Sequence, residues 1–201
     1  MPQEDLPVVQ WSPPVDGLSL GIEVPQHPFL FTPVVGWTGP IIIRQVDSAG
    51  RIVQETSNAG GHWDSKAIVR VHLKNNSAKA LFWSESPAVW SVSFSAPNFE
   101  QPPPWYGQKP PPLHGEPICL NPAQEAVMTL PMSRVFDIWP SVPRGNYTVT
   151  VSYSPNELLK YARGGEGNWT HPFDVPGFWT GTVATPAIVV RVEHPAQPPT
   201  K

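Results

Sequence analysis

Apolar and polar residues alternate strictly over residues 147–154. Because successive side chains of a β-strand point to opposite faces, this pattern predicts a strand with one buried face and one exposed face. Hydroxyl side chains occupy the face predicted to be exposed. The face predicted to be buried consists of Tyr147, Val149, Val151 and Tyr153.

A turn precedes this predicted strand at residues 143–145, which read Pro-Arg-Gly. Tyr147 follows Gly145 by two residues. This spacing is typical of the tyrosine corner of Greek-key sandwiches, in which the hydroxyl of a tyrosine near the start of a central strand bonds to backbone a few residues upstream. An ordinary strand after an ordinary turn is the alternative interpretation.

The same period of two predicts further short strands along the chain. In the strand predicted at residues 67–73, Arg70 and His72 are expected on the outward side. The other predicted strands cover residues 18–24, 80–83, 89–94, 125–130, 178–183 and 187–192.

Residues 41–46 and 51–56 flank a turn that ends in Gly50, which predicts a β-hairpin. Helix is expected only as short turns, at residues 133–139 and 156–162. About eight to ten short strands with regularly spaced turns are typical of an antiparallel β-sandwich. We therefore expect an all-β fold, namely an Ig-like Greek-key sandwich with an extra hairpin and a long Pro-rich loop.

The composition fits a folded chain that is rich in turns. Its 28 prolines are excluded from helix interiors and central strands, and so require many turns and edges. Disordered chains are poor in aromatic residues, whereas this chain has nine Trp and eight Phe. The net charge is −3 and no Lys/Arg run occurs, so nucleic-acid binding is not expected. The single cysteine excludes an internal disulfide.

The chain divides into three predicted parts. Residues 1–16 are expected to form an extended arm whose Trp11 docks on the body, residues 17–193 the sandwich domain, and residues 194–201 a Pro-rich tail. The Pro-rich insertion at residues 96–117 is too long for an ordinary connection and indicates a functional or mobile loop. No apolar run reaches the roughly 18 residues of a membrane helix, so a membrane-spanning role is not expected.

Several motifs follow one another in a fixed order. They comprise an opening Leu-x-Leu-x-Ile strand, a Val-x-Leu-x-Asn strand and turn, an aromatic-Asp piece, the Pro-x-Gly-x-Tyr strand and a closing Trp-Thr-Gly-x-Val strand. This order resembles a recurring Ig-like β-sandwich domain of bacterial proteins, similar to proteinase-inhibitor-type sandwiches and to the non-catalytic sandwich beside some zinc metallopeptidases. The matching stretches are residues 18–24, 71–77, 120–125, 135–138, 143–153 and 179–186. Residues 120–125 correspond to a Leu-x-Pro-Gly-Glu segment of the family, which precedes an alternating strand, but lack its glycine.

No motif for catalysis or metal binding is present. His62 with Asp64 and His171 with Asp174 lack the tight ligand spacing of zinc sites, which favours structural or solvated roles. Neither a Gly-x-Ser-x-Gly elbow nor a phosphate loop occurs. Cys119 is expected to be a small buried hydrophobe. We therefore expect no enzymatic activity and no cofactor, although paired carboxylates of a carbohydrate-active sandwich could converge only in three dimensions.

Aromatic residues in predicted loops are the candidate site. Trp105 and Tyr106 lie in the Pro-rich insertion, and Trp169 and Phe173 lie in a Gly-rich loop. Exposed loop aromatics anchor protein partners or stack on sugars. Core capping is the alternative for the loop aromatics in general, which also include Phe178 and Trp179.

The expected function is a non-catalytic interaction module that binds a protein, such as a protease or an envelope component, ahead of a glycan. The low charge, the high Trp and Pro content and the family resemblance favour an extracytoplasmic bacterial protein whose signal is absent from this chain. A cytoplasmic location is the alternative.

Overall fold

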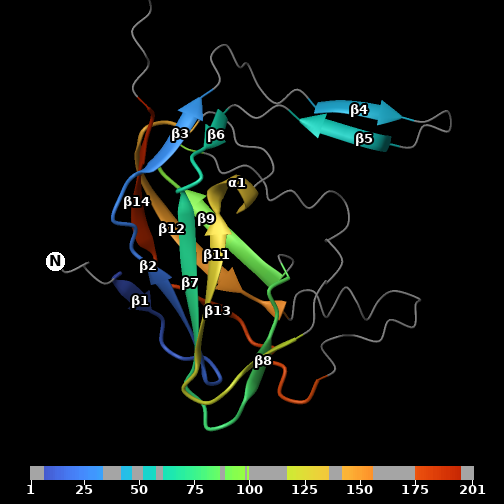
Figure 1. The fold of residues 1–201 in the computed structure, drawn as a ribbon, viewed down its shortest axis with the longest axis vertical. Coiled ribbons are helices and arrows are strands. Elements are labelled where there is room, and N and C mark those ends of the chain that lie inside the picture. The colour runs from blue at the N-terminus through green and yellow to red at the C-terminus, as the bar shows by residue number, and fades with distance from the viewer. Residues whose placement is uncertain are drawn as a thin grey trace, which may run out of the picture.

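The computed structural model describes residues 7–33, 42–46, 52–57, 61–86, 89–97, 99, 117–135, 142–155 and 175–195. These residues form β-strands and a short helix, α1 (Met132–Val135), which begins one residue before the first predicted helical turn. The chain is therefore all-β, as its alternating pattern predicted, and its strands form several sheets (Figure 1).

Four antiparallel strands form the first sheet, in the order β1, β2, β7, β11. Central β7 alternates as predicted, with Val69, Val71 and Leu73 buried and Arg70 exposed. The predicted arm contributes β1, which pairs along the edge of β2. The bounds of these strands are Val9–Trp11 for β1, Leu18–Glu23 for β2, Ile68–Asn75 for β7 and Glu125–Pro131 for β11.

The second sheet is organised around β12 (Gly145–Tyr153). One edge of β12 pairs with β9, and the opposite edge pairs with β14 and then with β13. In addition, β14 pairs in parallel with β3, and β3 pairs with β6. These strands are β3 Phe29–Pro33, β6 Gly61–Trp63, β9 Trp90–Ser95, β13 Val183–Ala184 and β14 Ile188–Glu193.

Two smaller antiparallel pairs complete the described structure. The first, β4 (Ile42–Val46) with β5 (Ile52–Ser57), confirms the predicted hairpin. The second pairs β8 (Leu81–Trp83) with β10 (Ile118–Leu120). These two strands precede and follow the segment that contains β9 and the Pro-rich insertion, so their pairing brings the ends of that segment together.

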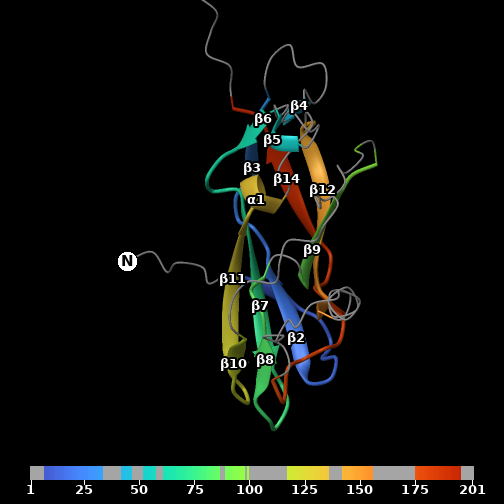
Figure 2. The same cartoon turned by 90° about the vertical axis from the view of Figure 1, so that its right-hand side faces the viewer.

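The two larger sheets lie as two layers (Figure 2) and share one hydrophobic core. From the first sheet, the inward side chains of β2 and β7 enter this core, and from the second sheet those of β12 and β14. Each buried Val or Leu side chain contributes about 1.5–3 kcal/mol relative to an exposed one. On β12, the residues that the sequence predicted to be buried are at most 2% exposed, namely Tyr147, Val149, Val151 and Tyr153.

Tyr147 confirms the predicted hydrogen bond of the corner that precedes β12. Its hydroxyl donates to the carbonyl oxygen of Pro143 at 2.8 Å. Its ring stacks on Phe94 of β9, with ring centroids 4.4 Å apart. Burial raises the pKa of the Tyr147 hydroxyl. The residue therefore anchors the turn to the core through both its polar and its apolar parts.

The strand predicted at residues 178–183 is only partly present. Phe178 forms an isolated bridge with Phe82, and regular pairing resumes at β13. Between them the ring of Trp179 folds over Gly181, where a Cβ atom would lie 2.6 Å from the indole. The large ring thus turns into the core instead of continuing the alternation.

The prediction that Cys119 is buried is wrong. Cys119 lies in the middle of β10 and is exposed. Its neighbour Leu120 is 1% exposed and belongs to the core. Because adjacent side chains of a strand point to opposite faces, the burial of Leu120 places Cys119 on the outside.

Candidate binding surface

The predicted partner-binding residues Trp105, Tyr106, Trp169 and Phe173 lie outside the described residues. Their role stays a prediction. His171 and Asp174, one of the two weighed metal-site pairs, lie outside them as well.

Phe178 and Trp179, the other two loop aromatics, belong to the core. They are 8% and 4% exposed. Trp179 stacks on Tyr153 with ring centroids 5.5 Å apart, and its indole N–H donates to the carbonyl oxygen of Val15 at 3.2 Å. The core-capping alternative therefore holds for these two rings.

The second weighed pair, His62 and Asp64, shows no shared site. His62 is exposed on β6. Asp64 accepts the backbone N–H of Lys66 through Oδ1 at 2.8 Å, which stabilises a turn. Within the described part of the chain, no three His, Cys, Asp or Glu side chains gather in a way that could hold a metal ion.

The outer face of the first sheet carries an ion network centred on His72. The ring atom Nδ1 lies 2.6 Å from Oε1 of Glu125, and Nε2 lies 2.9 Å from Oε1 of Glu23. His72 points outward, as predicted, yet it is only 7% exposed because its neighbours cover it. Each ring nitrogen of His72 therefore lies within hydrogen-bond distance of one carboxylate oxygen.

Trp11 of β1 forms the cover of this network. Its ring meets the ring of His72 edge-on at 5.9 Å, and the Lys74 ammonium lies 5.8 Å from its centroid. Gly21 makes this approach possible, since a Cβ atom there would lie 2.9 Å from the Trp11 ring. Arg70 completes the network through a 3.3 Å ion pair with Glu23.

The chemistry available to this network is structural. The two carboxylates face different nitrogens of one ring, so they do not converge on a common ligand position. The members of the network come from three strands, with Glu23 on β2, Arg70 and His72 on β7 and Glu125 on β11, and Trp11 on β1 adds a fourth. The long side chains on this face therefore bind one another and hold the sheet together.

The outer face of the second sheet carries short hydroxyl side chains, which we call the hydroxyl face. Across β9 and β12, Ser91 lies opposite Ser152 and their Oγ atoms are 2.8 Å apart. Val189 of β14 lies opposite Thr148 and is 62% exposed. The hydroxyl face comprises Ser91, Ser93, Ser95, Thr148, Thr150, Ser152 and Val189.

Short side chains leave this face flat and open. Ser91, Ser93, Ser95 and Thr148 are exposed. A partner that packs on such a surface can approach close to the sheet. Its binding costs little side-chain conformational entropy, since Ser and Thr have few rotamers to lose.

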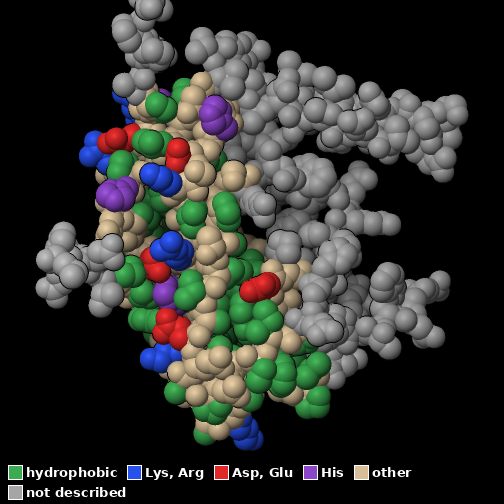
Figure 3. Space-filling model, in the orientation of Figure 1, with side chains coloured by type: hydrophobic (Ala, Val, Ile, Leu, Met, Phe, Trp, Pro, Cys, Tyr) green, Lys and Arg blue, Asp and Glu red, His purple; other side chains and the backbone are tan. Residues whose placement is uncertain are grey.

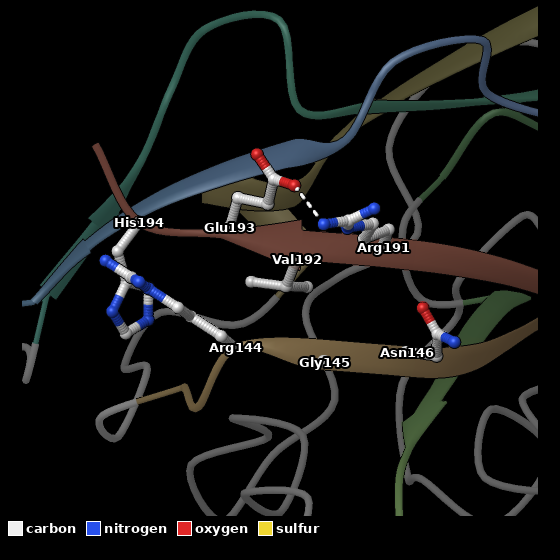
Figure 4. Close-up of a pocket in the computed structure, with 7 residues that line it drawn as sticks. All are labelled: Arg144, Gly145, Asn146, Arg191, Val192, Glu193 and His194. Carbon is white, nitrogen blue, oxygen red and sulfur yellow. Dashed lines mark ion pairs between the residues drawn. The ribbon is translucent and has the colours of Figure 1, made fainter. Parts of the chain in front are cut away.

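A groove of about 470 Å³ lies beside the hydroxyl face, at the start of β12 (Figure 4). We call it the arginine groove. Asn146 and Arg191 lie opposite each other on β12 and β14, and Arg144 and His194 lie toward one end of the groove in the figure. The backbone of Gly145 pairs with that of Val192 between these side chains.

Two polar contacts hold the walls of the arginine groove. Arg191 bonds to Glu193 at 2.8 Å, and Nε2 of His194 lies 2.7 Å from the carbonyl oxygen of Val142. Within the described residues the guanidinium of Arg144 makes no hydrogen bond or ion pair and is exposed. The groove thus offers an unpaired cation beside a flat, uncharged surface.

Neither a protein-family model, nor a curated protein, nor a solved structure matches this chain. In the part of the chain described, no helix has the length and apolar character needed to cross a membrane.

Sequence reasoning did not find the arginine groove or the role of His72. Both depend on pairings between distant residues, such as Asn146 with Arg191 and His72 with Gly21. One signal was present, namely the hydroxyl residues at alternate positions of residues 147–154 and of residues 91–95. When the outward-facing positions of two strands are all Ser or Thr, the surface that they form carries no charge.

Proposed function

We propose that this chain is a non-catalytic interaction domain of the Ig-like Greek-key sandwich class, and that it binds a protein partner. The class is supported by the order of the strand pairings. β2, β7 and β11 share one sheet, β9, β12 and β14 share the other, and β3 pairs in parallel with β14. The hydrogen bond of Tyr147 to Pro143 has the geometry of a tyrosine corner, which adds support.

The hydroxyl face is the observation that carries the binding role. The described charged residues of the first sheet contact one another or, for Lys74, the ring of Trp11, whereas the hydroxyl face is open and its side chains are short. Fold alone does not assign a partner, so the proposal rests on this surface and on the exposed Val189 in it.

A protein partner is favoured over a glycan because the hydroxyl face contains no aromatic ring on which a sugar could stack. The rings of Phe178 and Trp179 are buried. The loops that carry Trp105 and Tyr106, and Trp169 and Phe173, remain proposed as further anchors for the same partner. A protease or an envelope component stays the expected partner, and an extracytoplasmic location stays a prediction.

Two exposed valines provide a matched test of this function. Val189 is 62% exposed on the second sheet, and Val127 is 52% exposed on the outer face of the first. Val189→Arg places a long cation on the hydroxyl face and should weaken partner binding by at least about tenfold, whereas Val127→Arg should leave binding unchanged. The assay is capture of partner from an extract of the source cells by each immobilised variant, with melting temperatures measured in parallel.

A protein that wild type and Val127→Arg retain, and that Val189→Arg loses at an unchanged melting temperature, supports the proposal. Equal capture by all three variants contradicts it.

A further inference from the structure

We propose that the arginine groove binds a single carboxylate group of the partner. This inference rests on the proposed protein-binding function and gives that function a chemical specificity. Guanidinium groups recognise carboxylates through paired, charge-assisted hydrogen bonds, which are stronger than neutral ones. The exposed guanidinium of Arg144, which pairs with none of the described residues, supplies such a group at the wall of the groove.

The charge balance of the groove selects one negative charge. Arg144 and Arg191 contribute two positive charges, and Glu193 contributes one negative charge at 2.8 Å from Arg191. These three side chains therefore sum to +1. A monoanionic carboxylate neutralises this sum, whereas a phosphate dianion would leave an excess negative charge beside Glu193.

The groove is also held in shape before a ligand arrives. Two hydrogen bonds to adjacent carbonyl oxygens hold the turn that carries Arg144. The Tyr147 hydroxyl bonds to the carbonyl of Pro143, and Nε2 of His194 bonds to the carbonyl of Val142. The floor is strand backbone, where Gly145 pairs with Val192. A volume of about 470 Å³ accommodates an acidic side chain, and it lies within the range of ligand pockets. The backbone that carries Arg144 is therefore preorganised, which reduces the ordering cost of binding.

The carboxylate can come from an acidic side chain of the partner or from its free carboxyl terminus. Four probes separate these sources in NMR titrations of the ¹⁵N-labelled full-length protein. They are Ac-Ala-Glu-Ala-NH₂, its Gln counterpart, Ac-Ala-Ala-Ala with a free carboxylate, and inorganic phosphate. The signals to follow are the backbone amides of Gly145 and Asn146 and the side-chain Nε–H of Arg144.

We expect saturable shifts of these signals with one or both carboxylate peptides, and the tighter of the two identifies the source. Arg144→Gln should weaken that binding by about tenfold or more, because a charged hydrogen-bond donor is lost. Arg70→Gln is the matched control, since Arg70 is an exposed arginine already paired with Glu23 on the other sheet. Glu193→Gln should tighten carboxylate binding by removing the repelling charge.

The proposal is overturned if neither carboxylate peptide shifts these signals, if the Gln peptide acts as strongly, or if phosphate binds as tightly. It is also overturned if Arg144→Gln binds like wild type. These outcomes are distinct from failure of the proposed function. If Val189→Arg loses the partner but the carboxylate peptides do not bind, the hydroxyl face is supported as the binding surface. The proposal that the arginine groove binds a carboxylate is then wrong.

Discussion

On the outer face of the first sheet, Trp11 contacts both His72 and Lys74, and Glu23 and Glu125 bind the two nitrogens of the His72 ring. On the outer face of the second sheet, serines and threonines end close to the backbone (the first of these faces is toward the viewer in Figure 3). Both faces cover the same core. The difference shows that one sheet uses its outer side chains for its own cohesion, while the other leaves its surface available.

The shared core is where a substitution should have the largest effect on both faces. Val149→Asp puts a charge at a position that is 0% exposed and should cost more than about 4 kcal/mol, enough to unfold the domain. Thr148→Asp, one residue away on the hydroxyl face, should change the free energy of unfolding by about 0.5 kcal/mol or less. Urea denaturation measures both. Similar losses at the two positions would contradict the assigned strand faces.

The ion network should give the next largest effect. His72→Ala leaves Glu23, whose side chain is 15% exposed, without its closest partner. We expect a loss of about 1–3 kcal/mol in the free energy of unfolding, because Oε1 of the partly buried Glu23 loses its hydrogen-bond partner and only Oε2 keeps one, the exposed Arg70. Thr150→Ala on the hydroxyl face is the control and should cost little. If the two substitutions cost the same, the first sheet does not depend on its outer side chains.

Tyr153 predicts a smaller effect that depends on pH. Burial raises the pKa of this tyrosine above its ordinary value of 10.0, and the Ser84 N–H bond to its hydroxyl partly offsets the rise. Above pH 10.0 the unfolded protein ionises first and binds fewer protons than the folded protein. The free energy of unfolding should therefore fall by about 1.4 kcal/mol per pH unit above that value until the folded tyrosine ionises too.

Denaturation from about pH 9 to pH 11 tests this slope, because the loss should begin near the ordinary pKa of 10.0 and continue as the pH rises further. Tyr153→Phe should remove part of the slope, while the smaller part due to Tyr147, whose pKa burial also raises, remains. A slope that is the same in both proteins would show that Tyr153 is not the group responsible.

Local patterns were sufficient to predict the strands that alternate over several residues. Residues 18–24, 67–73 and 147–154 each alternate over at least three two-residue repeats. The structure forms strands β2, β7 and β12 at these positions. The Tyr147 corner was also predictable, because its turn and its spacing are local. The all-β class follows from these elements together.

Short strands and distant pairings could not be predicted. Pro33 and the nearby prolines conceal β3, yet Pro33 lies at the end of the strand, opposite Gly61, where a missing N–H is tolerated. β6 has only three residues. The arginine groove depends on the register that sets Asn146 opposite Arg191, and no local pattern encodes a register between strands so far apart in the sequence.

Hydroxyl-radical footprinting of the protein with and without its captured partner tests the central claim most directly. It reads the solvent exposure of Val189 and Val127 in a single experiment, and both are exposed in the free protein. We predict that the partner protects Val189 and its strand β14 from oxidation while Val127 and Trp11 react as before. Protection of Val127 and Trp11 with Val189 unprotected would contradict the assignment of the hydroxyl face as the binding surface.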